Sequence, residues 1–207
     1  MTTYLFVRHA THDLMKRGVV AGRKSGVHLN DFGKKQAEQV AERLASLPIE
    51  AIYSSPLERA CETAAPLAAK LGLPLQIAAE FNEIDFGAWT GRSFQDLDDI
   101  PEWQQWNRFR STALTPSGES MLAVQTRALA KISALRIRDG LLAVFTHGDV
   151  IRAVVAHFLG VHLDLFQRIQ IDVASVSVIQ LDTCSVVVRL VNGTGTWPEF
   201  LASFRDQ

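Results

Sequence analysis

The sequence predicts an α/β fold, a three-layer sandwich in which a mostly parallel central sheet carries helices on both faces. Two observations support this fold class. Short apolar runs alternate along the chain with amphipathic helical patterns, and several of the apolar runs stop abruptly on polar residues. Such runs are typical of buried strands that deliver side chains to the carboxyl edge of a parallel sheet. The 207 residues, 47% hydrophobic and 21% charged, fit a single domain over residues 1–207.

The first part of the chain predicts two strands with a loop and a helix between them. The apolar run at residues 4–7 is expected to form the first strand, and the polar, glycine-containing residues 10–30 a loop. Residues 31–46 predict a helix, since apolar residues recur there every three or four positions. Residues 51–54 predict a second, short strand.

The next helix has a strong start signal in the sequence. Ser55 is expected as its N-cap, Pro56 as its first helical residue and Glu58 as the partner in a capping box. The pattern continues to residues 71–72, with a bend expected at Pro66.

The rest of the chain alternates in the same way after one irregular stretch. Residues 75–78 predict a third strand, and residues 79–117 an irregular excursion with one short helix near 101–110. Gly118-Glu119-Ser120 introduces a helix that runs to about Arg138. The remaining expected elements are a strand at 141–145, a helix at 149–159 and a closing pair of strands at 173–181 and 185–191.

Composition argues against several classes of partner. The formal net charge is −1, so no bulk field attracts nucleic acid or a membrane surface. Cys61 and Cys184 form neither a disulfide framework nor a metal motif, which favours reduced thiols and a cytoplasmic location. The chain begins without a secretory pattern, and charged residues interrupt every apolar run before the ~20 residues of a membrane span. The oligomeric state is left open.

Four segments carry the candidate chemistry. Arg8 and His9 end the first strand, and Arg59 lies in the first turn of a helix, where side chains lean back toward the N-terminus. Glu83 lies in an acidic, aromatic loop, and His147 ends the strand at 141–145. If these edges converge, two guanidinium groups, two imidazoles, a carboxyl group and two helix N-termini surround one pocket. This combination favours a bound phosphate.

The same residue types suggest a reaction. Two arginines can hold phosphoryl oxygens and stabilise their developing charge. One histidine can attack phosphorus while the other donates to the oxygens, and a carboxylic acid can protonate the leaving alkoxide. Because the cations are side chains of the protein, no metal ion and no cofactor is expected.

The motifs around these residues resemble those of a known family. They are Arg8-His9-Ala10, Ser54-Ser55-Pro56-Leu57-Glu58-Arg59-Ala60, Glu83-Ile84-Asp85-Phe86-Gly87-Ala88-Trp89, Gly118-Glu119-Ser120 and Thr146-His147-Gly148. In this order they resemble the phosphoglycerate-mutase-like branch of the histidine phosphatase superfamily, and the resemblance spans residues 4 to about 191.

The resemblance implies a phosphoglycerate mutase-like fold and a role for each core residue. His9 would be phosphorylated and the phosphohistidine then hydrolysed. Arg8, Arg59 and His147 would bind the transferring phosphoryl group, and Glu83 would act as acid and then as base. This chain departs from the usual family motif at three places. Ala10-Thr11-His12 replaces the usual Gly-Glu-Thr, Met15 replaces a later Asn, and Thr90 replaces a Glu. These departures bear on the substrate more than on the chemistry.

The predicted function is therefore that of a metal-independent phosphomonoester hydrolase, a histidine acid-type phosphatase acting on a small phosphorylated metabolite. A phosphoglycerate mutase is the nearest alternative, although mutase relatives usually carry extra segments that this chain lacks. A non-catalytic phosphate-binding module is the alternative from another class.

Several further residues have two interpretations. Arg23, with Lys16, Arg17 and Lys24, could bind a second anionic group or form a solvated loop. Asp85 is the rival of Glu83 as the acid, although a capping or salt-bridging role is favoured for it. A metal site at His9 and His12 is disfavoured, because it lacks further ligands. Trp89, Trp103 and Trp106 could wall the pocket or pack in the core. Arg127 and Arg152 are interpreted as ordinary helix-surface or salt-bridge residues.

Overall fold

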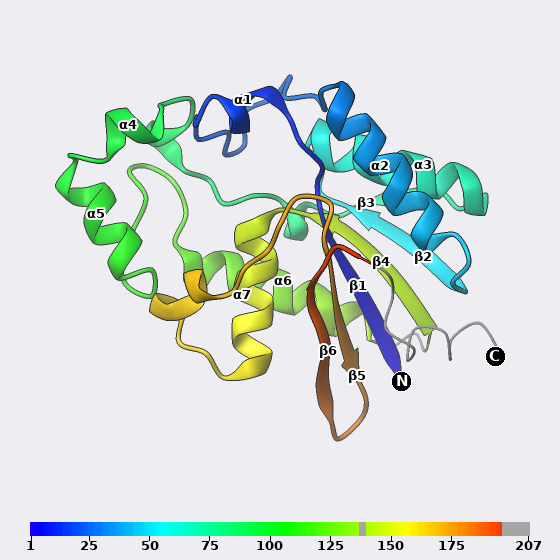
Figure 1. Cartoon of the computed structure of the whole chain (residues 1–207). Coiled ribbons are helices and arrows are strands. Elements are labelled where there is room, and N and C mark those ends of the chain that lie inside the picture. The colour runs from blue at the N-terminus through cyan, green and yellow to red at the C-terminus, as the bar shows by residue number, and fades with distance from the viewer. Residues whose placement is uncertain (137–139, 196–207) are drawn as a thin grey trace.

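The computed structural model describes residues 1–136 and 140–195 and contains one six-stranded sheet (Figure 1). The strand order is β3-β2-β4-β1-β5-β6. The strands are β1 (Thr2–Arg8), β2 (Ile49–Ser54), β3 (Leu75–Ile77), β4 (Gly140–Thr146), β5 (Val176–Leu181) and β6 (Val186–Gly193). Neighbours from β3 to β1 are parallel, while β5 runs antiparallel to both β1 and β6. The expected mostly parallel sheet is confirmed.

Helices cover both faces of this sheet, as expected. The α-helices are α1 (Asp13–Lys16), α2 (Asp31–Leu44), α3 (Glu58–Leu71), α4 (Phe94–Leu97), α5 (Pro101–Arg108), α6 (Met121–Leu135) and α7 (Gly148–Leu159). The short 3-10 helices are η1 (Ala79–Phe81), η2 (Gly87–Trp89) and η3 (Leu163–Arg168). Helices α2 and α3 lie on one face and α6 and α7 on the other, while α4 and α5 extend to one side.

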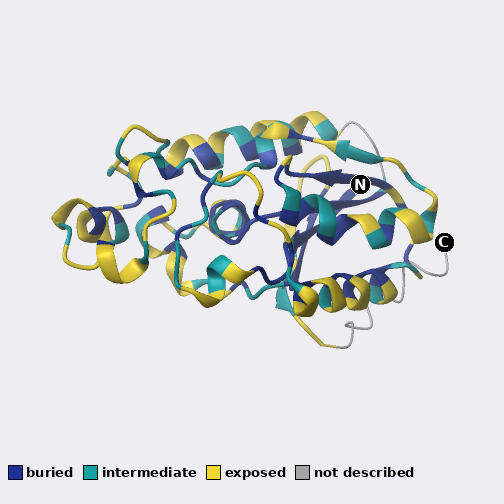
Figure 2. Cartoon of the chain, turned by 90° about the horizontal axis from the view of Figure 1, so that it is seen from above, coloured by how far each residue is buried: buried dark blue, intermediate teal, exposed yellow. Residues whose placement is uncertain are grey.

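The strand β1 shows why the chain forms three layers. Tyr4 and Phe6 belong to the core shared with α6 and α7, whereas Leu5 and Val7 belong to the core shared with α2 and α3. Successive side chains of a strand point to opposite faces, so an uninterrupted apolar run fills both cores. Seen from above, the central strands are buried, and the outer sides of the helices carry many of the exposed residues (Figure 2).

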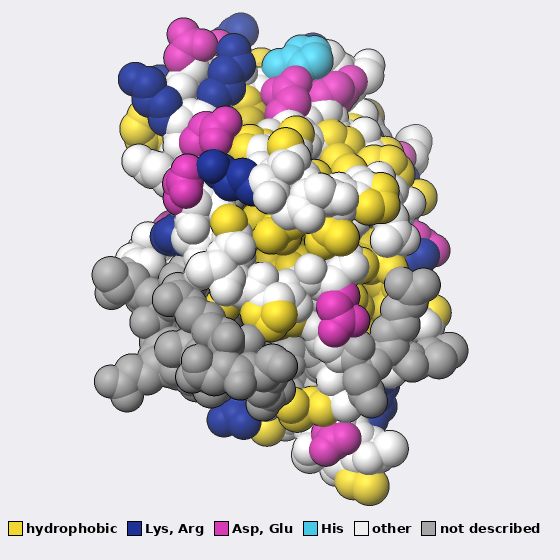
Figure 3. Space-filling view, turned by 90° about the vertical axis from the view of Figure 1, so that its right-hand side faces the viewer, with side chains coloured by type: hydrophobic (Ala, Val, Ile, Leu, Met, Phe, Trp, Pro, Cys, Tyr) yellow, Lys and Arg dark blue, Asp and Glu magenta, His cyan; other side chains and the backbone are white. Residues whose placement is uncertain are grey.

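The side of the molecule that carries α2, α3 and β3 combines two kinds of surface. Figure 3 shows charged side chains gathered at its upper end and hydrophobic ones across its middle. The strand β3 forms this edge of the sheet, and Ile77 at its end is 56% exposed. Within residues 1–136 and 140–195, every helix is too short or too polar to cross a membrane.

The start of α3 differs from its prediction. The helix begins at Glu58 with Leu57 as its N-cap, so Ser55 and Pro56 precede it. The Ser55 hydroxyl accepts a hydrogen bond from the Leu57 N–H at 3.3 Å and contacts His147 at 2.7 Å. The Glu58 carboxylate accepts from the Gly26 N–H at 2.9 Å instead of completing a capping box. The predicted cap residues thus bind neighbouring segments.

Other boundaries differ by a few residues. The predicted loop at 10–30 contains the short helix α1. The strand predicted from residue 173 begins at Val176, because Ala174 adopts a positive φ of 56° and donates its N–H to the Arg8 carbonyl at 3.1 Å. The predicted end of the third long helix at Arg138 lies outside the described residues, and α6 ends at Leu135.

Candidate active site

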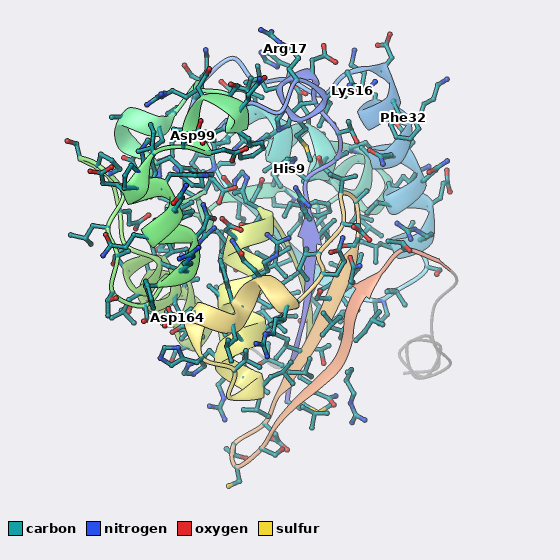
Figure 4. The ribbon with its side chains drawn as sticks, turned by 60° about the vertical axis from the view of Figure 1, so that its left-hand side comes forward. His9, Lys16, Arg17, Phe32, Asp99 and Asp164 are labelled. Atoms are coloured by element: carbon teal, nitrogen blue, oxygen red, sulfur yellow. The ribbon has the colours of Figure 1, made fainter. Side chains whose placement is uncertain are left out.

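The four predicted segments meet at the carboxyl ends of β1 and β4. A cavity of about 350 Å³ opens there, and Arg8, His9, Arg59 and Glu83 line it. His147 is fully buried beside them, with its ring centre 5.2 Å from that of His9. The structure therefore brings together all five residues that were expected to carry the chemistry. Figure 4 shows His9 at the end of β1, inside the molecule.

The pairing of β1 with β4 places the two histidines side by side. Arg8 pairs with Thr146 in the parallel register, and the His9 N–H donates to the Thr146 carbonyl at 2.9 Å. His147 follows Thr146 and is the N-cap residue of α7, whose first residue is Gly148. A Cβ on Gly148 would lie 3.2 Å from Nε of Arg8, so glycine leaves room for this guanidinium. The N-terminus of α7 thus faces the cavity together with Arg8.

His9 is held as a neutral imidazole with a defined tautomer. Its Nδ1 lies 2.8 Å from the Ala10 carbonyl, which can only accept, so the ring proton is on Nδ1 and Nε2 keeps its lone pair. Burial lowers the pKa of His9 well below its usual value, and the cations of Arg59 and Arg8 lower it further. The His9 ring is therefore neutral across the neutral pH range, with the lone pair of Nε2 available for a nucleophilic role.

The Ala10 departure from the family marker leaves this geometry intact. Ala10 is fully buried and is not among the residues with positive φ, so its backbone makes no demand for glycine. Its N–H donates to the Thr63 hydroxyl at 3.0 Å, and its carbonyl orients His9.

Two arginines, the half-buried Arg8 and the buried Arg59, present unused donors beside His9. Arg59 is fully buried and donates from Nη2 to the Gly22 carbonyl at 2.8 Å, but its Nε and Nη1 have no partner among the described residues. Arg8 donates from Nη1 to the Ile171 carbonyl at 2.6 Å, and its Nε has no partner in the same part of the chain. A buried donor without an acceptor costs about 1–3 kcal/mol, and more when it is charged. Such donors on permanent cations are suited to a bound anion.

The pKa of the Glu83 carboxyl group is suited to acid–base catalysis. Its Oε1 accepts from the Ile84 N–H at 2.9 Å, and its Oε2 lies 3.8 Å from Nδ1 of His147. Burial raises the pKa of Glu83 to about 7, and the negative charge of Asp149 contributes to this rise. The carboxyl group can therefore give or take a proton near neutral pH.

His147 contacts groups on both of its ring nitrogens. Nε2 lies 2.7 Å from the Ser55 hydroxyl, and Nδ1 faces Arg59 at 3.4 Å and Glu83 at 3.8 Å. Burial lowers its pKa well below the usual value, with Arg59 and His9 adding to the effect. The Arg59 guanidinium can only donate toward Nδ1, whereas the Ser55 hydroxyl can donate to Nε2 or accept from it. Ser55 is therefore a site residue that the sequence presented only as a helix cap.

The far wall of the cavity comes mainly from the irregular excursion. Its aromatic members are Phe86, Phe94, Trp103 and Trp106, and its charged members are Arg110, Asp149 and Arg152. Trp103 and Trp106 thus have the pocket role that was one of their two interpretations, whereas Trp89 packs edge-on against Trp103 with 5.1 Å between ring centres.

Arg110 is the main residue of this wall that the sequence did not indicate. Its guanidinium carbon lies 3.2 Å from the centre of the Trp106 ring, and Nη2 donates to Asn107 at 2.7 Å. Asp149 lies 3.5 Å from Arg110 and 2.8 Å from Arg152. Two cations therefore share one carboxylate. Arg152 forms the expected salt bridge but also lines the cavity.

His12 adds a third imidazole to the cavity. Its ring stacks on His9 with 5.2 Å between centres and 29° between planes. Burial lowers its pKa to about 4, so it is neutral, and its Nδ1 has no partner in the described chain. Across residues 1–136 and 140–195, no three His, Cys, Asp or Glu side chains are grouped as metal ligands.

The other candidate cations lie away from the cavity. Lys16 and Arg17 are exposed on α1, at the outer edge of the molecule and away from His9 (Figure 4), and Lys24 is exposed as well. Arg23 donates to the Glu83 carbonyl and to the Glu119 carboxylate, both at 2.8 Å. Its guanidinium thus holds a loop rather than facing the cavity.

The rival acid Asp85 is occupied by its own loop. Its Oδ1 accepts from the Gly87 N–H at 2.9 Å, a local capping contact. Its side chain lies outside the set that lines the cavity, whereas that of Glu83 belongs to it. This geometry favours Glu83 as the acid.

The raised pKa of Glu83 predicts a stability test. Above pH 4.5 the folded state binds more protons than the unfolded chain, so this residue's contribution to stability is lost as pH rises through about 7. Glu83→Gln cannot ionise and is expected to raise Tm by roughly 5 °C at pH 8. In thermal melts the gain should shrink toward zero at pH 4.5. A gain that is equal at both pH values would contradict the assignment.

Known proteins resemble this chain in sequence and in fold. The family model of the histidine phosphatase superfamily (branch 1) matches residues 4–194. Phosphoserine phosphatase 1 of Hydrogenobacter thermophilus is 30% identical over 207 residues, 97% of this chain and 96% of that protein. The adenosylcobalamin/alpha-ribazole phosphatase of Escherichia coli is 26% identical over 191 residues, 90% and 93% of the two chains. A mycobacterial glucosyl-3-phosphoglycerate phosphatase, solved with VO3, shares the fold with a TM-score of 0.84 at 23% identity, over 93% and 99% of the chains.

Proposed function

The chain belongs to the histidine phosphatase superfamily, branch 1, and we propose that it hydrolyses small phosphomonoesters through a phosphohistidine formed on His9. The observation that carries this proposal is the pairing of a neutral His9 with the unpartnered donors of Arg8 and Arg59. A nucleophile with a free lone pair lies beside guanidinium donors that have no partner among the described residues. The positive charge that a phosphoryl group needs is supplied by these side chains, so the proposed reaction requires no metal ion.

The first step transfers the phosphoryl group to the protein. Nε2 of His9 attacks phosphorus, the P–O ester bond breaks, and protonated Glu83 gives its proton to the leaving oxygen. The free donors of Arg8 and Arg59, together with the His147 ring, hold the phosphoryl oxygens as their charge redistributes.

The second step returns the protein to its starting state. The Glu83 carboxylate takes a proton from water, whose oxygen attacks phosphorus as the N–P bond to His9 breaks. Inorganic phosphate leaves, Nε2 regains its lone pair and Glu83 is protonated again. A group with a pKa of about 7 is suited to both roles.

The far wall indicates the class of leaving group. The cavity of about 350 Å³ suits a small metabolite. Its aromatic side chains can cover an apolar or flat body, and Arg110 and Arg152 share the single carboxylate of Asp149. This excess positive charge favours a leaving group with a carboxylate. Relatives named as phosphoserine and glucosyl-3-phosphoglycerate phosphatases support the same class.

Arg110→Gln tests this charge preference. The variant is expected to raise KM about tenfold to a hundredfold for phosphoserine and 3-phosphoglycerate, because it removes a charge-assisted contact. KM for p-nitrophenyl phosphate, which lacks a carboxylate, should change less than about threefold. The matched control is Arg168→Gln, which removes an exposed guanidinium on η3. Equal changes for charged and uncharged esters would contradict the preference.

Phosphate release from a panel of phosphomonoesters in EDTA tests the proposal itself. The panel should contain aryl, sugar and nucleotide phosphates, phosphoserine and 3-phosphoglycerate. Release despite the chelator is expected. Transfer of the phosphoryl group to a second hydroxyl without release would instead identify a mutase. Vanadate binding without turnover of any ester would identify a binding module.

A further inference from the structure

Three charged side chains from distant parts of the sequence meet on the loop that carries Glu83. Arg23 comes from the loop after α1, Glu119 precedes α6, and Arg127 lies within α6. Their side chains are 34%, 16% and 18% exposed in the same order, so all three are largely removed from solvent. None of them is among the residues that line the cavity. We refer to these three residues as the Arg23–Glu119–Arg127 cluster.

Glu119 is the centre of the cluster. Its Oε1 accepts from Nε of Arg127 at 2.8 Å. Its Oε2 accepts from Nη2 of Arg127 at 3.1 Å and from Nη2 of Arg23 at 2.8 Å. The contact with Arg127 is bidentate, which fixes the plane of that guanidinium as well as its position.

Both arginines also donate to backbone carbonyls of the loop that carries Glu83, and Nη1 of Arg23 lies 3.9 Å from the Asp85 carboxylate. Nε of Arg23 donates to the Glu83 carbonyl at 2.8 Å, and Nη2 of Arg127 donates to the same oxygen at 3.2 Å. Nη1 of Arg127 donates to the Glu80 carbonyl at 2.6 Å. The Glu119 N–H donates to the Asp85 carbonyl at 2.9 Å. The backbone is therefore held before, at and after Glu83.

These contacts control a side chain that has few supports of its own. Apart from its approach to His147, the Glu83 carboxyl is oriented by the Ile84 N–H, which belongs to the same loop backbone. A displacement of that backbone therefore moves the carboxyl group with it. A general acid must lie within about 2.6–3.2 Å of the atom it protonates, and a misplacement of about 1 Å can cost roughly a hundredfold in rate.

We propose that the Arg23–Glu119–Arg127 cluster is a positioning device for the general acid, with Glu119 as its central residue. This inference rests on the proposed role of Glu83 as the acid. It also gives Arg23 a function in place of the substrate contact that the sequence suggested. The cluster acts through the backbone carbonyl of residue 83, so its loss should affect the proton-transfer part of the reaction selectively.

Glu119→Gln tests the proposal with little change of shape. The amide can accept at one atom only, and its NH2 group faces the donors of Arg23 and Arg127. For an alkyl phosphate such as phosphoserine, kcat/KM should fall about tenfold or more. For p-nitrophenyl phosphate, whose leaving group needs little protonation, it should fall less than about threefold. Arg127→Lys, which cannot reach both carbonyls and the carboxylate, should give the same split.

A double-mutant cycle separates positioning from general stability. In a Glu83→Gln background no acid remains to be positioned, so adding Glu119→Gln should leave alkyl kcat/KM nearly unchanged. The matched control is Glu42→Gln, which removes a carboxylate paired with Lys70 at 2.8 Å on the α2–α3 side of the sheet. This control should change neither ester.

The outcomes distinguish a failure of the proposed positioning role from a failure of Glu83 as the general acid. Equal losses of alkyl and aryl activity, additive effects in the cycle, or unchanged kinetics in Glu119→Gln would each overturn the positioning role. If Glu119→Gln does not fold, the same outcomes are read from Arg127→Lys. If Glu83→Gln alone lacks a leaving-group split, the proposed acid itself is wrong, and this is seen before the cluster is tested.

Discussion

Replacing His9 with Ala is expected to lower phosphate release by about a thousandfold or more for every ester. The variant lacks the imidazole whose Nε2 lone pair is free beside the unpartnered donors of Arg8 and Arg59. Removing the atom that forms the covalent intermediate affects the first step whatever the leaving group, unlike the loss of the acid. The measurement is inorganic phosphate release from p-nitrophenyl phosphate and from phosphoserine.

A trapping experiment checks the same prediction at the level of the intermediate. Rapid quenching at alkaline pH with a radiolabelled ester should yield labelled wild-type protein and unlabelled His9→Ala. The matched control is His157→Ala, which removes an exposed imidazole on α7 and should be labelled like the wild type. Vanadate should still bind to His9→Ala, because Arg8 and Arg59 retain their unpartnered donors. A labelled His9→Ala protein would place the nucleophile elsewhere.

The sequence predicted the parts of the fold that depend on local pattern. The strand at residues 4–7 was recognisable because its residues fill two cores at once and are all apolar. Arg8 and His9 were recognisable for the same reason, since a buried strand that ends on polar groups predicts a site at the sheet edge. A closing pair of strands was also expected from its two adjacent apolar runs.

The sequence could not show how residues distant along the chain would use their polar groups. Ser55 has the local signature of a helix cap, but its hydroxyl contacts His147, ninety-two residues away along the chain. Arg23 has the signature of a solvated or anion-binding loop, but Glu119 lies within reach only after folding. Arg110 stands alone in an irregular segment, and only the placement of Trp106 and Asp149 makes it a wall of the cavity. Such contacts carry no periodicity that a sequence pattern could reveal.

The sequence and the structure lead to different interpretations of the stacked pair of His9 and His12. From the sequence, their spacing suggested a metal site that lacked further ligands. In the structure the rings lie face to face, and burial keeps both neutral. His12 therefore brings a neutral imidazole with an unpartnered Nδ1 to a position where the family marker has a small polar residue. This replacement alters the part of the cavity that contacts the substrate beside its phosphoryl group.

Glu83→Gln is expected to separate esters by the quality of their leaving groups. An alkoxide leaves poorly unless it is protonated, so kcat/KM for phosphoserine should fall about a hundredfold or more. The p-nitrophenolate ion leaves without a proton, so kcat/KM for its ester should fall less than about tenfold. Because kcat/KM reports the steps up to phosphorylation, it is insensitive to the second role of Glu83 in activating water. That second role should appear as a burst of nitrophenol equal to the enzyme concentration, followed by a slow steady state.

The pH profile gives an independent reading of the same group. Glu83 must be protonated to act as the acid, and its pKa of about 7 means that the protonated fraction falls as pH rises beyond neutrality. For phosphoserine, kcat/KM of the wild type should therefore decline above about pH 7, and Glu83→Gln should lose this decline along with most of its rate. The matched variant is Asp85→Asn, which removes the neighbouring carboxylate that caps Gly87 and should keep the wild-type profile. A profile that persists in Glu83→Gln but disappears in Asp85→Asn would transfer the acid role to Asp85, since only the group that carries the transferred proton can set that limb.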